Sequence, residues 1–397
     1  MAITDKKTGV WGLDQTYNKI NQGSIWTYSG ANQLFAFGKN THGQLGQNDR
    51  IEKSSPVQIP GTNWKYVQGN YGGSTGFTAV KTDGSLWSWG YSWGGGAMIN
   101  INSGSFSSPV QVGSGTDWNT DSRGKFTGPR LIAAAIKTDG SLWSAGYGTK
   151  GGLGQSSNTS RSSPVQVPGS WNSVSSTAYT MMAVKTDGTL WWWGENEQGS
   201  SGTNEADNQQ YNSPRQVGSD TTWHELSSES YSFMGSKTDG TLWTWGSNGS
   251  GGLGQNEAWT PSRKGYSSPV QIPGTTWEIS ADKFVKVTSG GGAIKTDGTL
   301  WMWGNNNKGQ IGDNAHDVNR SSPIQIPGTN WASISFTNNN VVATKTDGTA
   351  WSWGENEFGA LGQNDVDVHR SSPTQIPGTT WLRASTARDN GMLISNN

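Results

Sequence analysis

The sequence contains no cysteine, which excludes disulfide bonds, a cysteine nucleophile and a cysteine-ligated metal site. Charged residues are scarce at 14%, and 28 Lys plus Arg almost balance 29 Asp plus Glu. We therefore expect neither nucleic-acid binding nor attraction to an anionic membrane. No apolar run is long enough to cross a membrane, and residues 1–10 lack the apolar core of a signal peptide. These absences predict a soluble protein without membrane insertion.

Glycine and tryptophan are abundant instead, with 57 and 23 of the 397 residues. A repeat accounts for both. The string Lys-Thr-Asp-Gly followed by Ser or Thr occurs six times, and residues 29–38 are a degenerate seventh copy. Equivalent positions run from Leu34 to Ala350 in six intervals of about 53 residues. A Ser-Pro-x-Gln marker and a further Trp each occur seven times with similar spacing, so the chain is an array of seven units.

Each unit is predicted to contain four short strands. Alternating segments such as Leu86-Trp-Ser-Trp89 and Val57-Gln-Ile59 are typical of β-strands, and Asp-Gly is a strong hairpin signal. We name the strands A to D in chain order, with A opening at the further Trp and C at Leu-Trp-x-Trp-Gly. Seven such units predict an all-β, seven-bladed β-propeller over residues 24–397, preceded by an N-terminal arm, residues 1–23.

The strand C tryptophans are predicted to stabilise the packing between blades. Propeller sheets pack on both faces, so both sides of strand C should be buried. Burial of each ring stabilises the fold by on the order of 4 to 6 kcal/mol, before the conformational entropy lost on folding is subtracted. The rings predicted at interblade contacts are Trp87, Trp89, Trp191, Trp193, Trp243, Trp245, Trp301, Trp303, Trp351 and Trp353.

The run from Lys345 to Asn364 and the related run from Phe37 to Gly46 resemble the repeats of the regulator of chromosome condensation superfamily. The resemblance covers roughly residues 24–397 and implies a seven-bladed propeller. Basic nuclear-targeting runs, expected in the exchange-factor branch, are absent, and so is the Gly-Trp-Arg-His-Thr string of the plant ultraviolet-B receptor branch. The family's usual Gly-x-x-His before strand B is replaced at Thr75, Tyr179, Tyr231, Ser289 and Asn339.

Two terminal segments compete to close the ring. Residues 381–385 and 391–395 copy strands A and B, whereas residues 33–60 hold strands C and D of the first blade. Because residues 24–28 also read as a strand B, we predict that the C-terminus supplies only strand A and that residues 391–395 are left over. Pairing of N- and C-terminal strands removes exposed sheet edges.

No catalytic, cofactor or metal site is predicted, so the sequence favours a protein that is not an enzyme. Gly249–Gly254 matches the dinucleotide pattern G-x-G-x-x-G, and Gly72–Gly76 matches G-x-S-x-G, but neither is followed by the helix that the chemistry requires. The four histidines lack metal-ligand spacing. Asp313 and the segment Asp365-Val-Asp367 could bind Ca²⁺, although nearby arginines offer ion pairs instead.

Recognition is predicted on the face that carries the A-to-B and C-to-D loops. These loops hold the length variation, while the B-to-C and D-to-A turns repeat nearly unchanged, and variable loops on a rigid scaffold usually carry binding. The loop that holds Trp93 lacks the Asn-x-x-Gly-Gln-Leu motif of the repeat, and the loop that holds Trp259 is the longest of the C-to-D loops. The candidate recognition residues are Trp93, Trp259, Arg263, Tyr266 and Arg130.

Three functions remain open, with a protein or glycan surface as partner. The preferred interpretation is a non-enzymatic virion surface or tail-appendage protein that contacts a host receptor or another virion protein. It rests on residues 9–18, which are similar to short Val-Trp-x-Leu segments near the ends of tailed-phage virion and fibre proteins. The second is a cytoplasmic protein-binding propeller of the regulator of chromosome condensation type. The third is a glycan-processing enzyme, which would need acidic clusters at the mouth of the channel.

Overall fold

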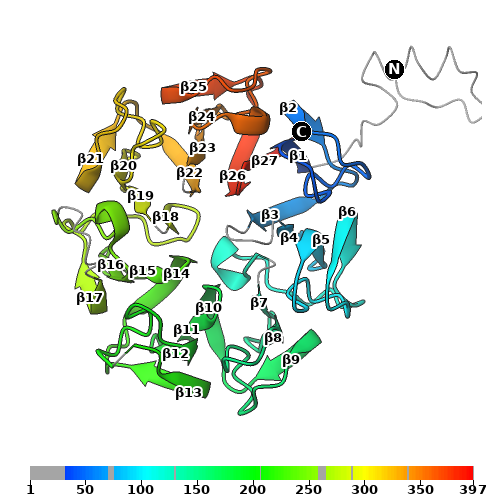
Figure 1. The fold of residues 1–397 in the computed structure, drawn as a ribbon, viewed down its shortest axis with the longest axis vertical. Coiled ribbons are helices and arrows are strands. Elements are labelled where there is room, and N and C mark those ends of the chain that lie inside the picture. The colour runs from blue at the N-terminus through cyan, green and yellow to red at the C-terminus, as the bar shows by residue number, and fades with distance from the viewer. Residues whose placement is uncertain are drawn as a thin grey trace, which may run out of the picture.

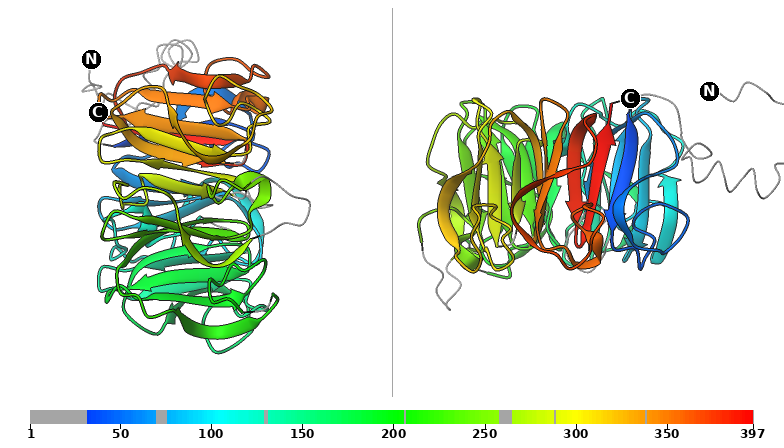
Figure 2. Two further views of the ribbon diagram at one scale, coloured as in Figure 1. Left: turned by 90° about the vertical axis from the view of Figure 1, so that its left-hand side faces the viewer. Right: turned by 90° about the horizontal axis from the view of Figure 1, so that it is seen from above.

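The structure is a ring of seven antiparallel sheets, as predicted. The computed structural model describes residues 32–69, 76–128, 131–205, 207–257, 265–287, 289–337 and 339–396. Its sheets surround a central axis, face-on in Figure 1 and edge-on as a thick disc in Figure 2. The described residues contain no α-helix, and accordingly no helix among them could span a membrane.

The blades are numbered in chain order, and their strands run from the channel outward. Blade 1 contains β26 (Trp381–Ala387), β27 (Asn390–Ser395), β1 (Gln33–Gly38) and β2 (Lys53–Gln58). Blade 2 contains β3 (Trp64–Gly69), β4 (Gly76–Lys81), β5 (Leu86–Ser92) and β6 (Gly104–Gln111). Blade 3 contains β7 (Ile132–Ile136), β8 (Leu142–Gly146) and β9 (Arg161–Val167). Blade 4 contains β10 (Trp171–Ser176), β11 (Thr180–Lys185), β12 (Leu190–Glu195) and β13 (Gln210–Val217).

The remaining blades follow the same order. Blade 5 contains β14 (Trp223–Glu229), β15 (Ser232–Lys237), β16 (Leu242–Gly246) and β17 (Tyr266–Gln271). Blade 6 contains β18 (Phe284–Val287), β19 (Gly290–Ile294), β20 (Leu300–Gly304) and β21 (Arg320–Ile326). Blade 7 contains β22 (Trp331–Phe336), β23 (Asn340–Lys345), β24 (Ala350–Gly354) and β25 (Arg370–Ile376). Short 3-10 turns η1 (Arg123–Lys125), η2 (Gly249–Gly251) and η3 (Glu357–Gly359) lie in the connections.

The Asp-Gly turns fix the register between strands B and C. In blade 2 the Asp83 carboxylate accepts hydrogen bonds from the backbone N–H (2.9 Å) and hydroxyl (2.7 Å) of Ser85. Gly84 takes φ +80°, a conformation that favours glycine, and donates to the carbonyl of Lys81 (3.0 Å). The turn therefore places Val80 opposite Leu86, and the alternation that follows buries both faces of β5.

The C-terminus closes the ring with two strands. The sequence analysis had predicted that it supplies only one strand, so that prediction was wrong. β27 pairs with β1 over six residues, from Gln33 opposite Ser395 to Gly38 opposite Asn390. It therefore occupies the strand B position that we had assigned to residues 24–28, which lie outside the described residues. In Figure 1 the red C-terminal strands lie beside the blue β1 and β2. The N-terminal arm (1–23) and the domain boundary at residue 24 are likewise not described and stay predictions.

Blades 3 and 6 depart from the prediction for strand A, which was expected to begin at the Trp that follows the Ser-Pro-x-Gln marker. Trp118 and Trp277 make only isolated bridges, to Lys137 and Lys295. In blade 3 the chain then leaves the sheet, so that η1 enters the channel and blade 3 keeps a three-stranded ladder. In blade 6 regular pairing resumes only at β18. Both departures bring polar chain segments to the central axis.

The second tryptophan of each strand C pair packs against the preceding blade. Trp353 is fully buried, and its Nε1 donates to the carbonyl of Gln310 in blade 6 (3.0 Å). Gly312 of that loop lies against the ring, since a Cβ there would come within 2.7 Å of Trp353 Nε1. Equivalent indole bonds join Trp89 to Gln44, Trp193 to Gly152, Trp245 to Ser200 and Trp303 to Gly252.

A second contact repeats at all seven interfaces and explains the rest of the loop motif. The Asn314 N–H donates to the carbonyl of Ser371 in the next blade (2.8 Å), and the Ser372 hydroxyl donates to Asn314 Oδ1 (3.1 Å). Gly309 passes so close that a Cβ would lie 2.7 Å from the Cα of Ser371. The backbone pairs are Asn48–Ser107, Asn100–Ser162, Ser156–Asn212, Asn204–Ser267, Asn256–Ser321, Asn314–Ser371 and, at the closing interface, Asn364–Ser54.

Candidate functional site

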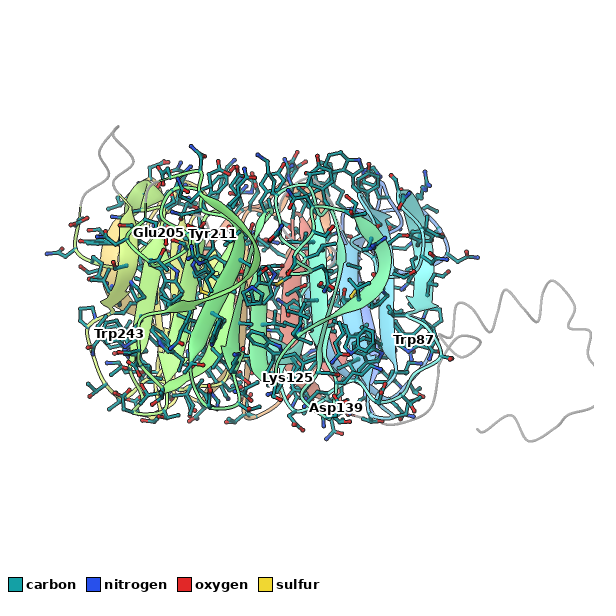
Figure 3. The ribbon with its side chains drawn as sticks, turned by 90° about the horizontal axis from the view of Figure 1, so that it is seen from below. Trp87, Lys125, Asp139, Glu205, Tyr211 and Trp243 are labelled. Carbon is teal, nitrogen blue, oxygen red and sulfur yellow. The ribbon has the colours of Figure 1, made fainter. Side chains whose placement is uncertain are left out.

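The strand order gives the disc two different faces. We call the face of the A-to-B and C-to-D loops the loop face, and the face of the B-to-C and D-to-A connections the turn face. Figure 3 shows both edge-on, with Glu205 and Tyr211 toward the loop face, and Trp87, Trp243, Lys125 and Asp139 toward the turn face.

The turn face repeats one contact, a lysine held between two indole rings. Lys185 Nζ lies 3.7 Å from the centroid of Trp191 and 5.5 Å from that of Trp171, a favourable cation–π geometry. The Thr189 hydroxyl accepts from Trp191 Nε1 (2.8 Å) and fixes the ring. Because the same arrangement recurs, this face offers little that is specific to one blade. The equivalent lysines are Lys81, Lys137, Lys237, Lys295 and Lys345.

The copy of this contact at Lys237 makes a pH-dependent contribution to the stability of the fold. Asp220 pairs with Lys237 Nζ (2.5 Å), and although partial burial opposes it, hydrogen bonds from Lys237 and Thr222 lower the pKa of Asp220 to about 2 from its ordinary 3.8. A lowered carboxylate pKa stabilises the fold above the unfolded value, and this stabilisation is lost as pH falls through the folded value. We expect Asp220→Asn to lower the free energy of unfolding by about 1 kcal/mol at pH 7 after solvent screening. Denaturant curves of wild type and variant should converge near pH 2; a difference that stays constant would contradict the assignment.

The η1 segment closes the turn-face side of the channel. Arg123 is buried and donates to the carbonyls of Ala281 and, at 3.4 Å, Ile334. Its Nε lies 3.9 Å from Asp282. One residue from blade 3 therefore ties blades 6 and 7 together across the axis.

The described residues enclose a small polar cavity in the channel. The cavity of about 60 Å³ is lined by hydroxyl groups such as Ser228, Thr337 and Thr386, and holds a few waters at most. Lys286 lines it, and burial lowers the pKa of this ammonium group to about 7.

Exposed apolar side chains gather on the loop face of four consecutive blades. Among the residues that the structure describes, every exposed large hydrophobic side chain belongs to blades 6, 7, 1 or 2. Ile51 (64% exposed), Val366 (52%) and Trp93 (49%) are the most exposed. Scattered single residues would need no explanation, but their restriction to consecutive blades makes these loops the candidate interaction surface. We call the C-to-D loop members the apolar arc: Val318, Val366, Val368, Ile51, Trp93 and Ile101.

Ion pairs fix the backbone of several loops that carry the apolar arc. In blade 7, Asp365 pairs with Arg370 (2.6 Å), and Val366 and Val368 lie between them. The buried Asn356 amide donates to the carbonyl of Asp365 (3.2 Å) and joins this pair to the loop base. The side chains are thus presented on a fixed backbone, which lowers the entropic cost of binding. The same bracing places Val318 between Asp313 and Arg320, and Ile51 between Asp49 and Lys53.

Comparison with known proteins agrees with this geometry. A family model of the regulator of chromosome condensation (RCC1) repeat matches residues 32–75, 239–293, 297–343 and 347–387. The matched segments make up a little under half of the chain and resemble RCC1 repeats. Three of the four matched segments begin at the Asp of a Lys-Thr-Asp-Gly turn, at Asp239, Asp297 and Asp347.

Solved structures share the complete ring. Human WBSCR16 superposes with a TM-score of 0.76 at 15% identity, over 93% of this chain and 100% of that chain. Prp20p from Saccharomyces cerevisiae, described with its binding to Gsp1p and histones, gives 0.76 at 16% identity, over 96% and 94%. Yeast RCC1 (Prp20) bound to Kap60 gives 0.76 at 16%, over 100% and 95%. At these identities the likeness establishes the fold alone. No curated protein matches the sequence.

The structure separates the predicted recognition residues. Trp93 in blade 2 stacks on Tyr147 of blade 3 (centroids 6.1 Å apart), which in turn contacts Tyr179 of blade 4 (6.3 Å). Tyr266 lies in blade 5, on the opposite side of the ring in Figure 1, where it donates to Glu257 (2.6 Å). Trp93 and Tyr266 are therefore not one patch. Trp259, Arg263 and Arg130 lie outside the described residues.

Sequence reasoning missed Tyr147 and the valines of the arc. Tyr147 follows the strand C glycine exactly where Tyr91 does one blade earlier, and this shared position was the available signal. Asp313 and Asp365, considered as Ca²⁺ ligands, instead pair with arginines. The described residues contain no group of three or more possible metal ligands.

Proposed function

We propose that this protein is a non-enzymatic binding propeller whose apolar arc docks a protein partner. The observation that carries the proposal is the confinement of exposed large hydrophobic side chains to blades 6, 7, 1 and 2. Their ion-pair bracing supports it, because preorganised anchors carry most binding energy at protein interfaces. A neighbouring charged rim, including Arg50, Glu52 and Asp317, provides the polar border that such interfaces have.

The comparisons favour a cellular partner over a virion role. The yeast structures with the same fold are described with protein partners, namely Gsp1p, histones and Kap60. None of the matches reported above is a virion or fibre protein. The segment that suggested one, residues 9–18, lies outside the described residues. We therefore replace the virion interpretation by the second hypothesis, a protein-binding propeller of the RCC1 type.

A triple substitution tests the apolar arc. Ile51→Ser, Val366→Ser and Val368→Ser together should weaken partner binding at least tenfold, since truncation at hot spots costs about 2 kcal/mol or more. Affinity capture from cells that express the protein identifies the partner, and titration of the purified partner gives the dissociation constant. The melting temperature should stay close to that of wild type because all three side chains are exposed.

Two controls define the outcome. Asn158→Ala alters the equivalent loop of blade 3, and Lys185→Gln alters the turn face; both should bind the partner as wild type does. A triple variant that binds as tightly as wild type would refute the apolar arc. Loss of binding in Lys185→Gln alone would place the interface on the turn face.

A further inference from the structure

A continuous stripe of aromatic side chains crosses the loop face from blade 1 to blade 4. His42 of blade 1 lies against Tyr91 of blade 2, with ring centroids 4.9 Å apart. Trp93 follows Tyr91 by two residues and stacks on Tyr147 of blade 3 (6.1 Å). Tyr147 in turn contacts Tyr179 of blade 4 (6.3 Å). We call these five residues the aromatic stripe, which follows consecutive blades of the ring in Figure 1.

The stripe arises because blades 2 and 3 carry tyrosine where blade 4 carries a charged residue. The residue after the strand C glycine of blade 4 is Glu195, which pairs with Lys150 of blade 3 (2.9 Å). Tyr91 and Tyr147 hold the same position in blades 2 and 3, and each meets a ring from the preceding blade. The two tyrosines therefore replace an ion pair by aromatic surface.

The stripe is uncharged and offers hydrogen-bond donors. Burial and neighbouring cationic groups lower the pKa of His42, so its ring is uncharged at neutral pH. Trp93 is 49% exposed, and the tyrosines of the stripe are half-buried. The Trp93 indole N–H and the hydroxyls of Tyr147 and Tyr179 donate to no acceptor among the residues that the structure describes. The surface therefore suits a ligand rich in apolar groups and in hydrogen-bond acceptors.

A carboxylate without an ion pair marks the blade 4 end of the stripe. The Glu195 backbone N–H donates to the carbonyl of Tyr179 (3.1 Å), which places the start of the blade 4 loop beside the last ring. Glu197, two residues further on, is half-buried and accepts a hydrogen bond from the Tyr231 side chain. Burial and the adjacent Glu195 raise the pKa of Glu197 above its ordinary value. Because Lys150 is held by Glu195, no described cation lies within ion-pair distance of Glu197, and a cation from a ligand would complement it.

We propose that the aromatic stripe binds a proline-rich segment of the protein partner in the polyproline II conformation, with a basic residue at the end that faces Glu197. Aromatic surfaces commonly receive such segments, because a polyproline II backbone leaves its carbonyl groups unpaired and can accept from indole and phenol donors. The rings from Trp93 to Tyr179 span about four residues of polyproline II, which rises about 3.1 Å per residue. A saccharide fits less well, because its hydroxyls also need acceptors and no stripe residue has a carboxylate or amide side chain. This inference rests on the proposed function and names the chemistry of the partner.

Calorimetric titration of the full chain with short peptides tests the proposal. The panel contains octaproline, octaproline with an arginine at either end, and Gly-Ser peptides of the same length with the same arginines. One arginine-flanked proline peptide should bind at a single site, about threefold more tightly than octaproline, as one exposed ion pair allows. The Gly-Ser peptides should bind at least tenfold more weakly, because they lack the apolar rings and the preformed conformation.

Two substitutions locate the binding on the stripe. Trp93→Ala should weaken the better peptide at least tenfold, or about 1.4 kcal/mol. Glu197→Gln should remove the advantage of the arginine and leave the affinity for octaproline within about twofold of wild type. Tyr147→Ser should weaken the better peptide as Trp93→Ala does, and it carries the test should Trp93→Ala fail to fold.

The matched control is Phe358→Ala, which removes a ring from the loop position that His42 holds in blade 1. Phe358 contacts Lys39 outside the stripe, so peptide affinity should stay within about twofold of wild type. Peptide binding should also survive the triple substitution of the apolar arc, so failure of either proposal can be recognised without the other. Absence of binding by both arginine-flanked proline peptides would overturn the inference, as would unchanged affinity in Trp93→Ala and Tyr147→Ser. Binding of maltose in place of peptides, lost in Trp93→Ala, would assign the stripe to a saccharide and overturn it as well.

Discussion

Replacing Trp303 by alanine is expected to lower the free energy of unfolding by about 3 to 5 kcal/mol. The ring is fully buried between blades 5 and 6, and its Nε1 donates to the carbonyl of Gly252 (3.1 Å). Gly254 packs so closely that a Cβ there would lie 3.0 Å from Nε1. The substitution therefore empties an interblade contact and leaves a loop carbonyl without its donor. Thermal melting and denaturant titration measure the loss.

Trp301→Ala is the matched control for this position. Trp301 belongs to the same strand β20 but is only half-buried, and it packs against Lys295 (4.2 Å) near the turn face. We expect it to destabilise by about half as much or less. A Trp303→Ala protein that melts within about a degree of wild type would contradict the claim that the buried indole groups stabilise the contacts between blades.

Deleting residues 381–397 is expected to open the propeller. The deletion removes β26 and β27, so blade 1 keeps only β1 and β2, and β1 loses the partner with which it pairs over six residues. An isolated two-stranded sheet is marginally stable at best. Limited proteolysis should then cut first between residues 33 and 60, a segment that the full chain protects.

A deletion of residues 1–23 provides the comparison, since none of the described strands belongs to that segment. It should leave protease resistance of blade 1 unchanged. Equal resistance of the full chain and the chain that ends at residue 380 would show that the N-terminal half closes blade 1 without β26 and β27.

The sequence repeat made the propeller architecture predictable. The way the ring closes was not predictable, because it depends on which of two similar segments pairs with β1. Marker spacing gives seven units, and each Asp-Gly turn fixes one hairpin. Residues 24–28 and 391–395 both alternate like strand B, and only the pairing of Leu34 with Ile394 decides between them. The departure of η1 was equally hidden, because Arg123 finds its carbonyl partners in blades 6 and 7, far away in sequence.

The candidate site was predictable as a face but not as a set of residues. Loop variation pointed to the C-to-D loops and to Trp93. Val366 and Ile51 are single apolar residues in polar loops, and the ring alone brings blades 7 and 1 side by side.

Hydrogen exchange of the protein with and without its captured partner tests the central claim most directly. The account predicts slower exchange in the C-to-D loops of blades 6, 7, 1 and 2, centred on residues 49–53, 313–320 and 365–370, with the Lys-Thr-Asp-Gly turns unchanged. Protection confined to the turn face, with those loops unaffected, would contradict it.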